Sequence, residues 1–481
     1  MAEQDPGDDR RRLREIRRLY LEVERYNRIL AARPPTGDYP LSVRVDMLQQ
    51  EVARIRQQQL PDIDDSTSDR EPDQLVDDKV QATSATPLSG LTGFQYLQRR
   101  QYGPVRADLS AMYADVVAQQ IPSTLKEKEF ELGAMNKIFA AKWLNDKQVV
   151  FGTKCNQLVV IDVLSGQMTT IPMLQSSEES VPAQQPCGIH GIAINPSGTM
   201  LATGASNTND IGIYKLPTFD PFCVGEGAHS DWVFDLEWID DEFLITGSRD
   251  NNMALWRIDN VDESQTSRMS CLYVPEYAVK KPLVVKKCEK AQKVRALSVN
   301  RSKKEMAVLS LNAFLHLWDI ETFEQIWSSR LTCGKENVCM TVSEDKNLYA
   351  VGSHSCVTLV DCRKKLCQPV PTKPRERGTF QGIRSLSFKR DIITIGTGMG
   401  LVMFYDVRAA KFLDNQTGYP CQLAVGSGWL RQDDNFRDIF MGAAYPNAIY
   451  THAYDDSGVR LFAAGGPLPA GLWGNYGALW A

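Results

Sequence analysis

The sequence lacks the features that mark disulfide-rich domains, metal sites and membrane spans. Its eleven cysteines are odd in number and scattered, without a CxxC pair or a Cys/His spacing that would hold zinc. We therefore expect reduced thiols, no disulfide framework and no bound metal. No segment approaches eighteen consecutive apolar residues, and the N-terminus has no secretory signal. These absences predict an intracellular chain that does not bind membranes.

Enzyme signatures are also missing. The chain has no phosphate-binding GxxxxGK loop, no GxSxG nucleophile turn and no motif of paired carboxylates or histidines. The glycine-rich run Gly396-Thr397-Gly398-Met399-Gly400 lies between two predicted strands, whereas a phosphate loop is followed by a helix. We interpret it as a tight hairpin turn, and we expect a protein without catalytic residues or cofactors.

The overall composition is that of a folded protein. The chain has 481 residues, of which 43% are hydrophobic and 23% are charged, so most of it can bury a core. The formal net charge of −5 gives no overall attraction to nucleic acid or to anionic membranes. An acidic partner would need a local basic patch, and we expect no direct binding of nucleic acid.

The first quarter of the chain differs from the rest. Residues 1–61 show helical periodicity interrupted at Pro34 and Pro35, which predicts a helical hairpin, a short coiled coil or two surface helices. Residues 62–92 form a predicted disordered linker, because positions 62–78 carry eight acidic side chains against the single Arg70. Helical character returns over residues 93–127, around a break at Gly103-Pro104.

Beyond residue 128 a repeat of strand, polar turn, strand and strand recurs. Its second strand ends in glycine, or once in serine, at Gly152, Gly204, Gly247, Ser310, Gly352, Gly396 and Gly465. Seven units at roughly 42 to 69 residue intervals are typical of WD-type blades with insertions near 165–186, 259–291 and 411–447. The predicted fold class is therefore all-β, a seven-bladed WD-repeat β-propeller over residues 128–481 with an N-terminal α-helical extension.

Two details of the repeat predict how the ring is built. His229, Asp250 and Trp256 occupy the positions at which WD blades form a buried hydrogen-bonded cluster, so this histidine is interpreted as structural. The last repeat ends after its third strand, at Trp480. We expect residues 129–132 to supply the missing fourth strand and thereby to remove an exposed sheet edge.

Basic residues recur where the repeats begin. The second positions of the innermost strands are Phe139, His190, Phe234, Arg295, Cys339, Arg384 and Tyr450. In a propeller these positions lie on the same face as the turn between the second and third strands, which contributes Lys154 and Arg249. Lys137 and Lys293 immediately precede two innermost strands. The predicted binding pocket at this opening contains Lys137, Lys154, His190, Arg249, Lys293, Arg295 and Arg384, and suits a ligand rich in carboxylates or phosphates.

Two third strands end in a similar charged pattern. Phe404-Tyr405-Asp406-Val407-Arg408, and more weakly Val360-Asp361-Cys362-Arg363, resemble the endings of WD proteins that bind the cullin-4 ubiquitin ligase adaptor. The aspartate and the arginine could instead link neighbouring blades.

Longer segments strengthen this resemblance. The stretches 118–123, 125–130, 151–156, 188–190, 382–385 and 464–469 resemble the WD-repeat cullin-4-associated factors. The resemblance implies a substrate receptor that joins the cullin-4 and RING subunits, through the damage-specific DNA-binding protein 1 adaptor, to proteins with acidic, diglutamate-type C-termini. It implies that these C-termini, which serve as degradation signals (degrons), are bound by the seven residues of the predicted pocket. We call this end of the channel the basic opening. It also implies a helix-loop-helix over 93–127 that binds the adaptor, with contacts from Phe94, Tyr96, Leu97, Leu109, Met112, Tyr113, Val116 and Arg408.

One alternative function remains open at this point. A propeller scaffold could bind acidic or phosphorylated partners without any ligase, and the presence of an adaptor-binding helix pair would distinguish a receptor from it. For the receptor we expect localisation in the cytoplasm and the nucleus, with Arg10-Arg11-Arg12 and Arg17-Arg18 as the basic clusters nearest to a nuclear signal.

Overall fold

The computed structural model describes residues 118–481, except positions 186, 260–276, 365, 372–381, 416–417 and 440–444. The predicted hairpin over 1–61, the linker over 62–92 and residues 93–117 of the predicted helix-loop-helix lie outside the described residues. Residues 118–120 are helical and lead into η1 (Ile121–Ser123). None of the helices among the described residues is long and apolar enough to cross a membrane.

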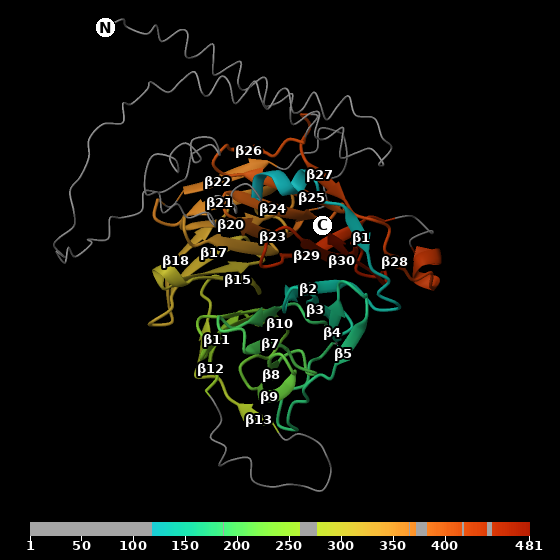
Figure 1. Cartoon of the computed structure of the whole chain (residues 1–481). Coiled ribbons are helices and arrows are strands. Elements are labelled where there is room, and N and C mark those ends of the chain that lie inside the picture. Colours follow the sequence, from blue (N-terminus) through green and yellow to red (C-terminus); the bar gives the residue numbers. More distant parts are fainter. Residues whose placement is uncertain are drawn as a thin grey trace, which may run out of the picture. The chain divides into compact units, whose positions relative to one another are not determined.

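Seven sheets, antiparallel except for one outer strand of the second, follow one another around a central channel, which confirms the predicted seven-bladed propeller (Figure 1). Blade 1 contains β2 (Ile138–Trp143), β3 (Gln148–Thr153), β4 (Leu158–Asp162) and β5 (Met168–Ile171). Blade 2 contains β6 (Ile192–Ile194), β7 (Met200–Gly204), β8 (Ile211–Lys215), β9 (Asp220–Gly225) and, parallel to β9, β13 (Ala278–Lys280). Blade 3 contains β10 (Val233–Trp238), β11 (Phe243–Ser248), β12 (Asn252–Arg257) and β14 (Val284–Lys287).

The remaining blades continue in chain order. Blade 4 contains β15 (Val294–Asn300), β16 (Glu305–Ser310), β17 (Phe314–Asp319) and β18 (Glu324–Arg330), with η3 (Arg301–Lys303) between its first two strands. Blade 5 contains β19 (Cys339–Ser343), β20 (Leu348–Gly352), β21 (Cys356–Asp361) and β22 (Leu366–Pro371). Blade 6 contains β23 (Ile383–Lys389), β24 (Ile392–Thr397), β25 (Leu401–Asp406), β26 (Lys411–Phe412) and β27 (Gln422–Ala424). Blade 7 contains β29 (Asn447–Tyr454), β30 (Leu461–Pro467), β31 (Gly474–Trp480), β1 (Glu127–Glu129) and β28 (Trp429–Leu430), and η4 (Asn435–Ile439) precedes β29.

The repeated glycine permits close packing between neighbouring blades. A Cβ atom on Gly247 would lie 2.5 Å from the Val294 side chain of the next blade, and one on Gly396 would lie 2.9 Å from Ile449. The corresponding distance from Gly352 to Ile383 is 2.7 Å. These distances are shorter than any ordinary carbon–carbon contact, so the second strand of one blade can approach the innermost strand of the next only without a side chain.

The N-terminal strand closes the ring as predicted, although two residues earlier in the sequence. β1 pairs with β31 in the register Glu127 with Trp480 and Glu129 with Ala478. The backbones of Lys126 and Ala481 exchange two further hydrogen bonds. Phe130, which we expected within the strand, is instead buried with Leu132 in the core between blades 7 and 1. Figure 1 shows the C-terminus beside β1.

The insertion predicted near 259–291 is partly regular structure. β13 extends blade 2, and β14 is the fourth strand of blade 3, so both strands come from a segment that we interpreted as an insertion. The insertion therefore covers the outer edges of two consecutive blades. Both strands are short, which made their period-2 pattern too brief to recognise.

Two smaller predictions have different outcomes. The predicted structural histidine is confirmed, because His229 Nε2 lies 2.7 Å from Thr246 Oγ1, which also accepts a hydrogen bond from Trp256 Nε1. The prediction that all cysteines stay reduced is wrong for one pair, Cys333 and Cys356, which form a disulfide. The loop before β19 brings Cys333 to the first residue of β21, a tertiary contact that the cysteine spacing does not reveal.

Candidate functional site

The two sets of residues predicted at the channel opening do lie on one face. In five blades, a backbone N–H just after the second strand donates to a carbonyl just before or at the start of the innermost strand of the same blade. These pairs are Lys154 with Lys137, Arg249 with Trp232, Leu311 with Lys293, His354 with Lys335, and Gly398 with Gly382. Each bond fixes a turn residue above the channel beside the entrance of the innermost strand.

A β-bulge directs the second residue of most innermost strands into the channel. The register shifts occur between Ile138 and Ala140, Val233 and Asp235, Val294 and Ala296, Ile383 and Ser385, and Ile449 and Thr451. The residues left unpaired at these five bulges are Phe139, Phe234, Arg295, Arg384 and Tyr450. A bulge leaves one residue unpaired and changes the direction of its side chain, so these positions can face the channel together.

Four consecutive blades contribute an aromatic half of the resulting ring. The His190 ring stacks on Phe139 with centroids 4.5 Å apart, and Tyr450 contacts the other side of Phe139 edge-on at 5.2 Å. Phe234 packs edge-on against His190 at 5.1 Å, and the Arg295 guanidinium lies 4.6 Å from the Phe234 centroid. Contacts of this geometry hold the ring residues in fixed orientations.

Arg295 and Arg384 form the cationic half of the ring. Burial lowers the pKa of Arg295, while attraction to Asp235 raises it. Asp235 accepts hydrogen bonds from the Leu236 and Leu297 backbones, yet burial raises its pKa to about 6. Arg384 Nη2 donates to Glu336 Oε2 at 2.7 Å. The guanidiniums stay protonated and therefore place two fixed positive charges at the channel wall.

His190 contributes shape and hydrogen bonding to the site but no charge at neutral pH. Burial first, and then the nearby charges of Arg295 and Lys154, lower the pKa of His190 well below its usual value. Its Nε2 atom lies 3.0 Å from the Cys187 thiol. Burial raises the pKa of Cys187 to about 11, so this cysteine is a thiol and not a nucleophilic thiolate.

Lys137 and Lys154 are both bound to one loop, residues 468–472 between β30 and β31. Lys137 is 1% exposed, and its ammonium donates to the carbonyls of Pro469 and Leu472. Lys154 Nζ donates to the Ala470 carbonyl at 2.7 Å. Burial and then the positive charge of Lys154 lower the pKa of Lys137 to about 7. The lysines therefore form and fix one wall of the opening.

Arg249 and Lys293 lie on the rim. The Arg249 guanidinium stacks 4.5 Å from the Trp232 centroid, and its Nε lies 3.6 Å from Asp231 Oδ2. Trp232 is itself held by a 3.0 Å hydrogen bond from its indole to the Gln185 carbonyl. Lys293 is exposed and has a left-handed backbone with φ of 63°. All seven predicted basic-opening residues are thus near the opening, in three different environments.

Besides Asp235 at the channel wall, two carboxylates lie near the rim of this opening, and sequence reasoning missed both. Asp231 and Glu336 lie two residues before the cores of their innermost strands, Val233 and Val338, beside the positions where we counted only cations. A search for all charged residues at these equivalent positions would have found both. Their presence makes the opening a mixed site in which cations are in excess.

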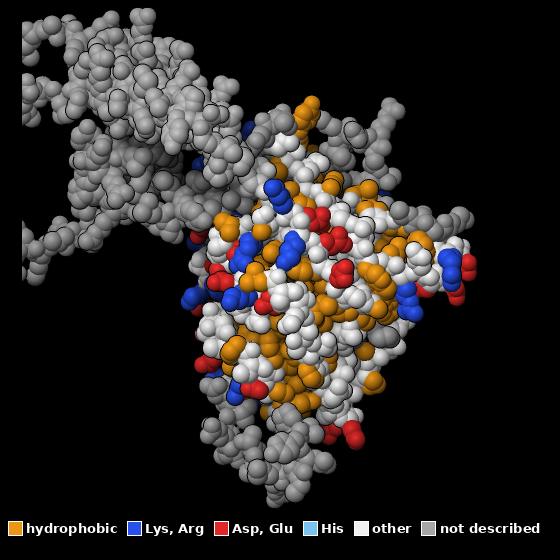
Figure 2. Space-filling model, turned by 45° about the vertical axis from the view of Figure 1, so that its right-hand side comes forward, with side chains coloured by type: hydrophobic (Ala, Val, Ile, Leu, Met, Phe, Trp, Pro, Cys, Tyr) orange, Lys and Arg blue, Asp and Glu red, His pale blue; other side chains and the backbone are white. Residues whose placement is uncertain are grey.

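On the face drawn in Figure 2, Lys and Arg side chains are interspersed with Asp and Glu side chains. Among the described residues, no group of three or more His, Cys, Asp or Glu side chains could hold a metal ion.

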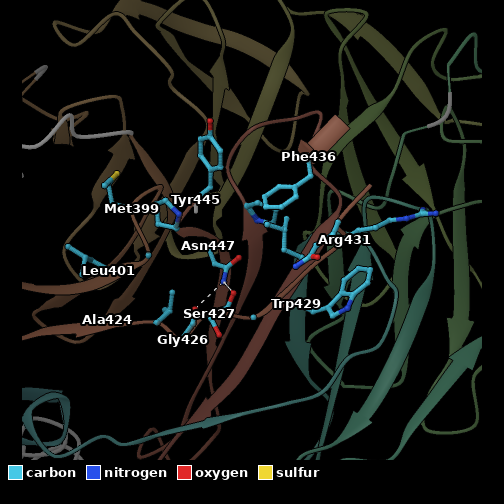
Figure 3. A pocket seen from close by; sticks show the side chains of 17 residues that line it. Met399, Leu401, Ala424, Gly426, Ser427, Trp429, Arg431, Phe436, Tyr445 and Asn447 are labelled. Atoms are coloured by element: carbon cyan, nitrogen blue, oxygen red, sulfur yellow. Dashed lines mark hydrogen bonds between the residues drawn. The ribbon is translucent and has the colours of Figure 1, made fainter. Parts of the chain in front are cut away.

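A hollow of about 980 Å³ lies between blades 6 and 7 (Figure 3). Trp429, Phe436 and Tyr445 contribute aromatic rings to it, and Asn447 donates hydrogen bonds to the Gly426 and Ser427 carbonyls in its wall. Arg431 is the one charged residue among its described lining residues. This hollow suits an apolar group better than a cluster of carboxylates, so the basic opening is the stronger candidate for an acidic ligand.

Most of the predicted adaptor-binding residues lie outside the described residues. Phe94, Tyr96, Leu97, Leu109, Met112, Tyr113 and Val116 are among the residues that the structure does not describe. Arg408 follows β25, is 59% exposed and lies 3.9 Å from Asp391 Oδ2 in the turn between β23 and β24. Because third strands end on the face opposite the basic opening, Arg408 is separated from that opening by the height of a blade.

A family model described as the DDB1- and CUL4-associated factor 12 beta propeller matches residues 121–481. The match begins six residues before β1 and therefore includes the strand that closes the ring.

Proposed function

The chain belongs to the DDB1- and CUL4-associated factor 12 family, non-catalytic substrate receptors of the cullin-4 ubiquitin ligase, and from that premise we propose how it selects substrates. It captures proteins whose C-termini are acidic, of the diglutamate type, by holding the terminal residues in the basic opening. The observation that carries this proposal is the ring in which Arg295 and Arg384 face the channel from blades 4 and 6.

The chemistry of the ligand matches the two halves of the ring. A C-terminal diglutamate has three carboxylates, and removing them from water together is costly unless several cations are already in place. Arg295 and Arg384 can each offer paired donors to a planar carboxylate, and Arg249 and Lys293 add positive charge above them. The methylene groups of the glutamates can pack on Phe139, Phe234 and Tyr450. The opening therefore offers both desolvation and charge compensation.

Adaptor binding belongs to other parts of the chain. We assign it to the predicted helix-loop-helix over 93–127 and to Arg408. Because Arg408 lies on the face opposite the basic opening, one receptor could hold the DDB1 adaptor and a substrate at the same time.

The proposal is tested by removing one ring arginine at a time. Hydrogen bonds to charged groups contribute about 1.5–3 kcal/mol, so Arg295→Ala or Arg384→Ala should weaken binding of a peptide ending in Glu-Glu by roughly tenfold to a hundredfold. Fluorescence anisotropy with a labelled peptide measures this change. Arg257→Ala is a matched control, because Arg257 ends β12 on the opposite face and is 55% exposed. If all three variants bound like the unmodified protein, the basic opening would not be the ligand site.

A further inference from the structure

The basic opening already holds a carboxylate of the protein itself. Glu336, in the loop before β19, accepts a 2.7 Å hydrogen bond from Arg384 Nη2 through its Oε2 atom. The other carboxylate at the opening, Asp231, is 3.6 Å from Arg249 Nε, beyond hydrogen-bond distance. Of these two contacts, only that between Glu336 and Arg384 has the geometry of a charge-assisted hydrogen bond.

The local backbone accommodates this contact. Glu336 has a φ of 54°, in the left-handed region that non-glycine residues seldom adopt. Gly382, also left-handed with a φ of 82°, faces the pair, and a Cβ there would lie 2.9 Å from Glu336 Oε2 and 3.2 Å from Arg384 Nη2. A side chain at position 382 would therefore disturb the pair. Residues from blades 5 and 6 cooperate to bring one carboxylate onto one guanidinium.

The Glu336 side chain is also placed so that it can move away from Arg384. Its side chain is 45% exposed, whereas that of Arg384 is 15% exposed. Its second oxygen, Oε1, lies 3.6 Å from His354 Nδ1, on the turn above the channel. Because the carboxylate is half-exposed, water or His354 can accommodate it when a ligand carboxylate takes its place at Arg384.

We propose that Glu336 is a specificity-determining residue that competes with ligand carboxylates for Arg384. The inference rests on the proposed function, because it concerns the same site. A ligand with one carboxylate exchanges one ion pair for another at Arg384 and gains little. A ligand with several carboxylates can displace Glu336 while it also engages Arg295, so the competitor favours multiply charged C-termini.

The test compares Glu336→Gln with the unmodified full-length chain. Glutamine keeps the size of the side chain and removes the competing charge. A peptide ending in Glu-Glu should bind about threefold to tenfold more tightly to the variant, because no carboxylate at position 336 competes with the peptide for Arg384. A peptide of the same sequence ending in Gln-Gln, which keeps only the terminal carboxylate, should gain more. Preference for the diglutamate peptide should therefore decrease.

Two controls separate occupancy of Arg384 from a general change of charge. Glu344→Gln removes one negative charge at the Arg301 pair, in the turn after β19 at the other end of that strand, and should leave peptide affinity unchanged. In an Arg384→Ala background, Glu336→Gln should no longer tighten binding, because the two effects are coupled through one contact.

The outcomes distinguish this inference from the function on which it rests. If the unmodified chain did not bind the Glu-Glu peptide at all, the proposed function would be wrong. If the unmodified chain bound this peptide but the Glu336→Gln variant bound it no more tightly, Glu336 would not be a competitor. The proposed function would be unaffected. Equal gains from Glu336→Gln and Glu344→Gln, or an undiminished gain without Arg384, would also overturn it.

Discussion

At the scale of single residues, Lys137 and Lys154 show that a basic side chain near a candidate binding site can hold the wall of that site in place. Both ammonium groups donate to carbonyls of the loop over 468–472. Arg295 and Arg384 instead face the channel from bulged positions. The sequence places all four residues near one opening, but only the tertiary structure separates the cations that hold the loop from those that face the channel.

The buried Lys137 should make stability depend on pH. Its folded pKa of about 7 lies below its ordinary value of 10.5. Below pH 7 both states are protonated, and the folded state carries the full penalty. Between pH 7 and 10.5 the unfolded state binds more protons, so stability rises with pH by up to about 1.4 kcal/mol per unit.

Urea denaturation at pH 7, 8 and 9 measures this effect. The difference in unfolding free energy between the unmodified protein and Lys137→Met should grow in favour of the unmodified protein as the pH rises. Methionine fills a similar volume and does not titrate. Parallel pH profiles for the two proteins would show that Lys137 is not the titrating group.

At the scale of elements, the repeated glycine explains how the blades pack. The sequence revealed these glycines because they recur, and the structure supplies the reason, which is contact between neighbouring blades. Gly204 is an informative exception, since a Cβ at that position would meet nothing within 4 Å. At this repeat position, a side chain is therefore excluded in some blades, as at Gly247, and has room in another, at Gly204.

Alanine at these two positions should have opposite consequences. Gly247→Ala should lower the free energy of unfolding by about 1–3 kcal/mol, because its Cβ would overlap Val294 and force the blades apart. Gly204→Ala should be neutral or slightly stabilising, since alanine reduces the freedom of the unfolded chain. Thermal melts of the two variants provide the comparison. Equal losses in both would refute a packing role for this glycine.

The closing strand allows a second test at this scale. Deletion of residues 1–92 should leave a cooperative propeller, whereas deletion through Gly133 removes β1, Phe130 and Leu132. Burial of each of these two side chains contributes about 1.5–3 kcal/mol, and the loss of β1 leaves β31 as an open edge. The longer deletion should melt at lower temperature and aggregate. Identical melting curves for the two truncations would show that the ring closes without β1.

Elements were predictable from sequence to the extent that they repeat. Turn glycines, the structural His229 and the need for a closing strand follow from comparing the seven units. The bulges at Arg295 and Arg384, the strands β13 and β14, and the disulfide between Cys333 and Cys356 do not. A bulge adds no recognisable residue type, and the other two features depend on contacts between segments that are distant in sequence.

At the scale of the whole molecule, the propeller separates two surfaces. The basic opening lies where the innermost strands begin, and Arg408 lies where a third strand ends, on the opposite face. On the proposed assignment, substrate capture at the opening and the adaptor contact of Arg408 therefore lie on separate faces. From the order of strands within a repeat, the sequence predicted which basic residues gather at the opening. The balance of charge there required Glu336 and Asp231 to be placed in three dimensions.

The central claim is that the opening recognises negative charge at a C-terminus. Equilibrium anisotropy should be measured with two labelled peptides that are identical except for a final Glu-Glu or Lys-Lys. We predict that the diglutamate peptide binds at least about tenfold more tightly, since each charged contact contributes about 1.5–3 kcal/mol, and that the preference decreases as salt rises. Equal affinities for the two peptides at low salt would contradict the account.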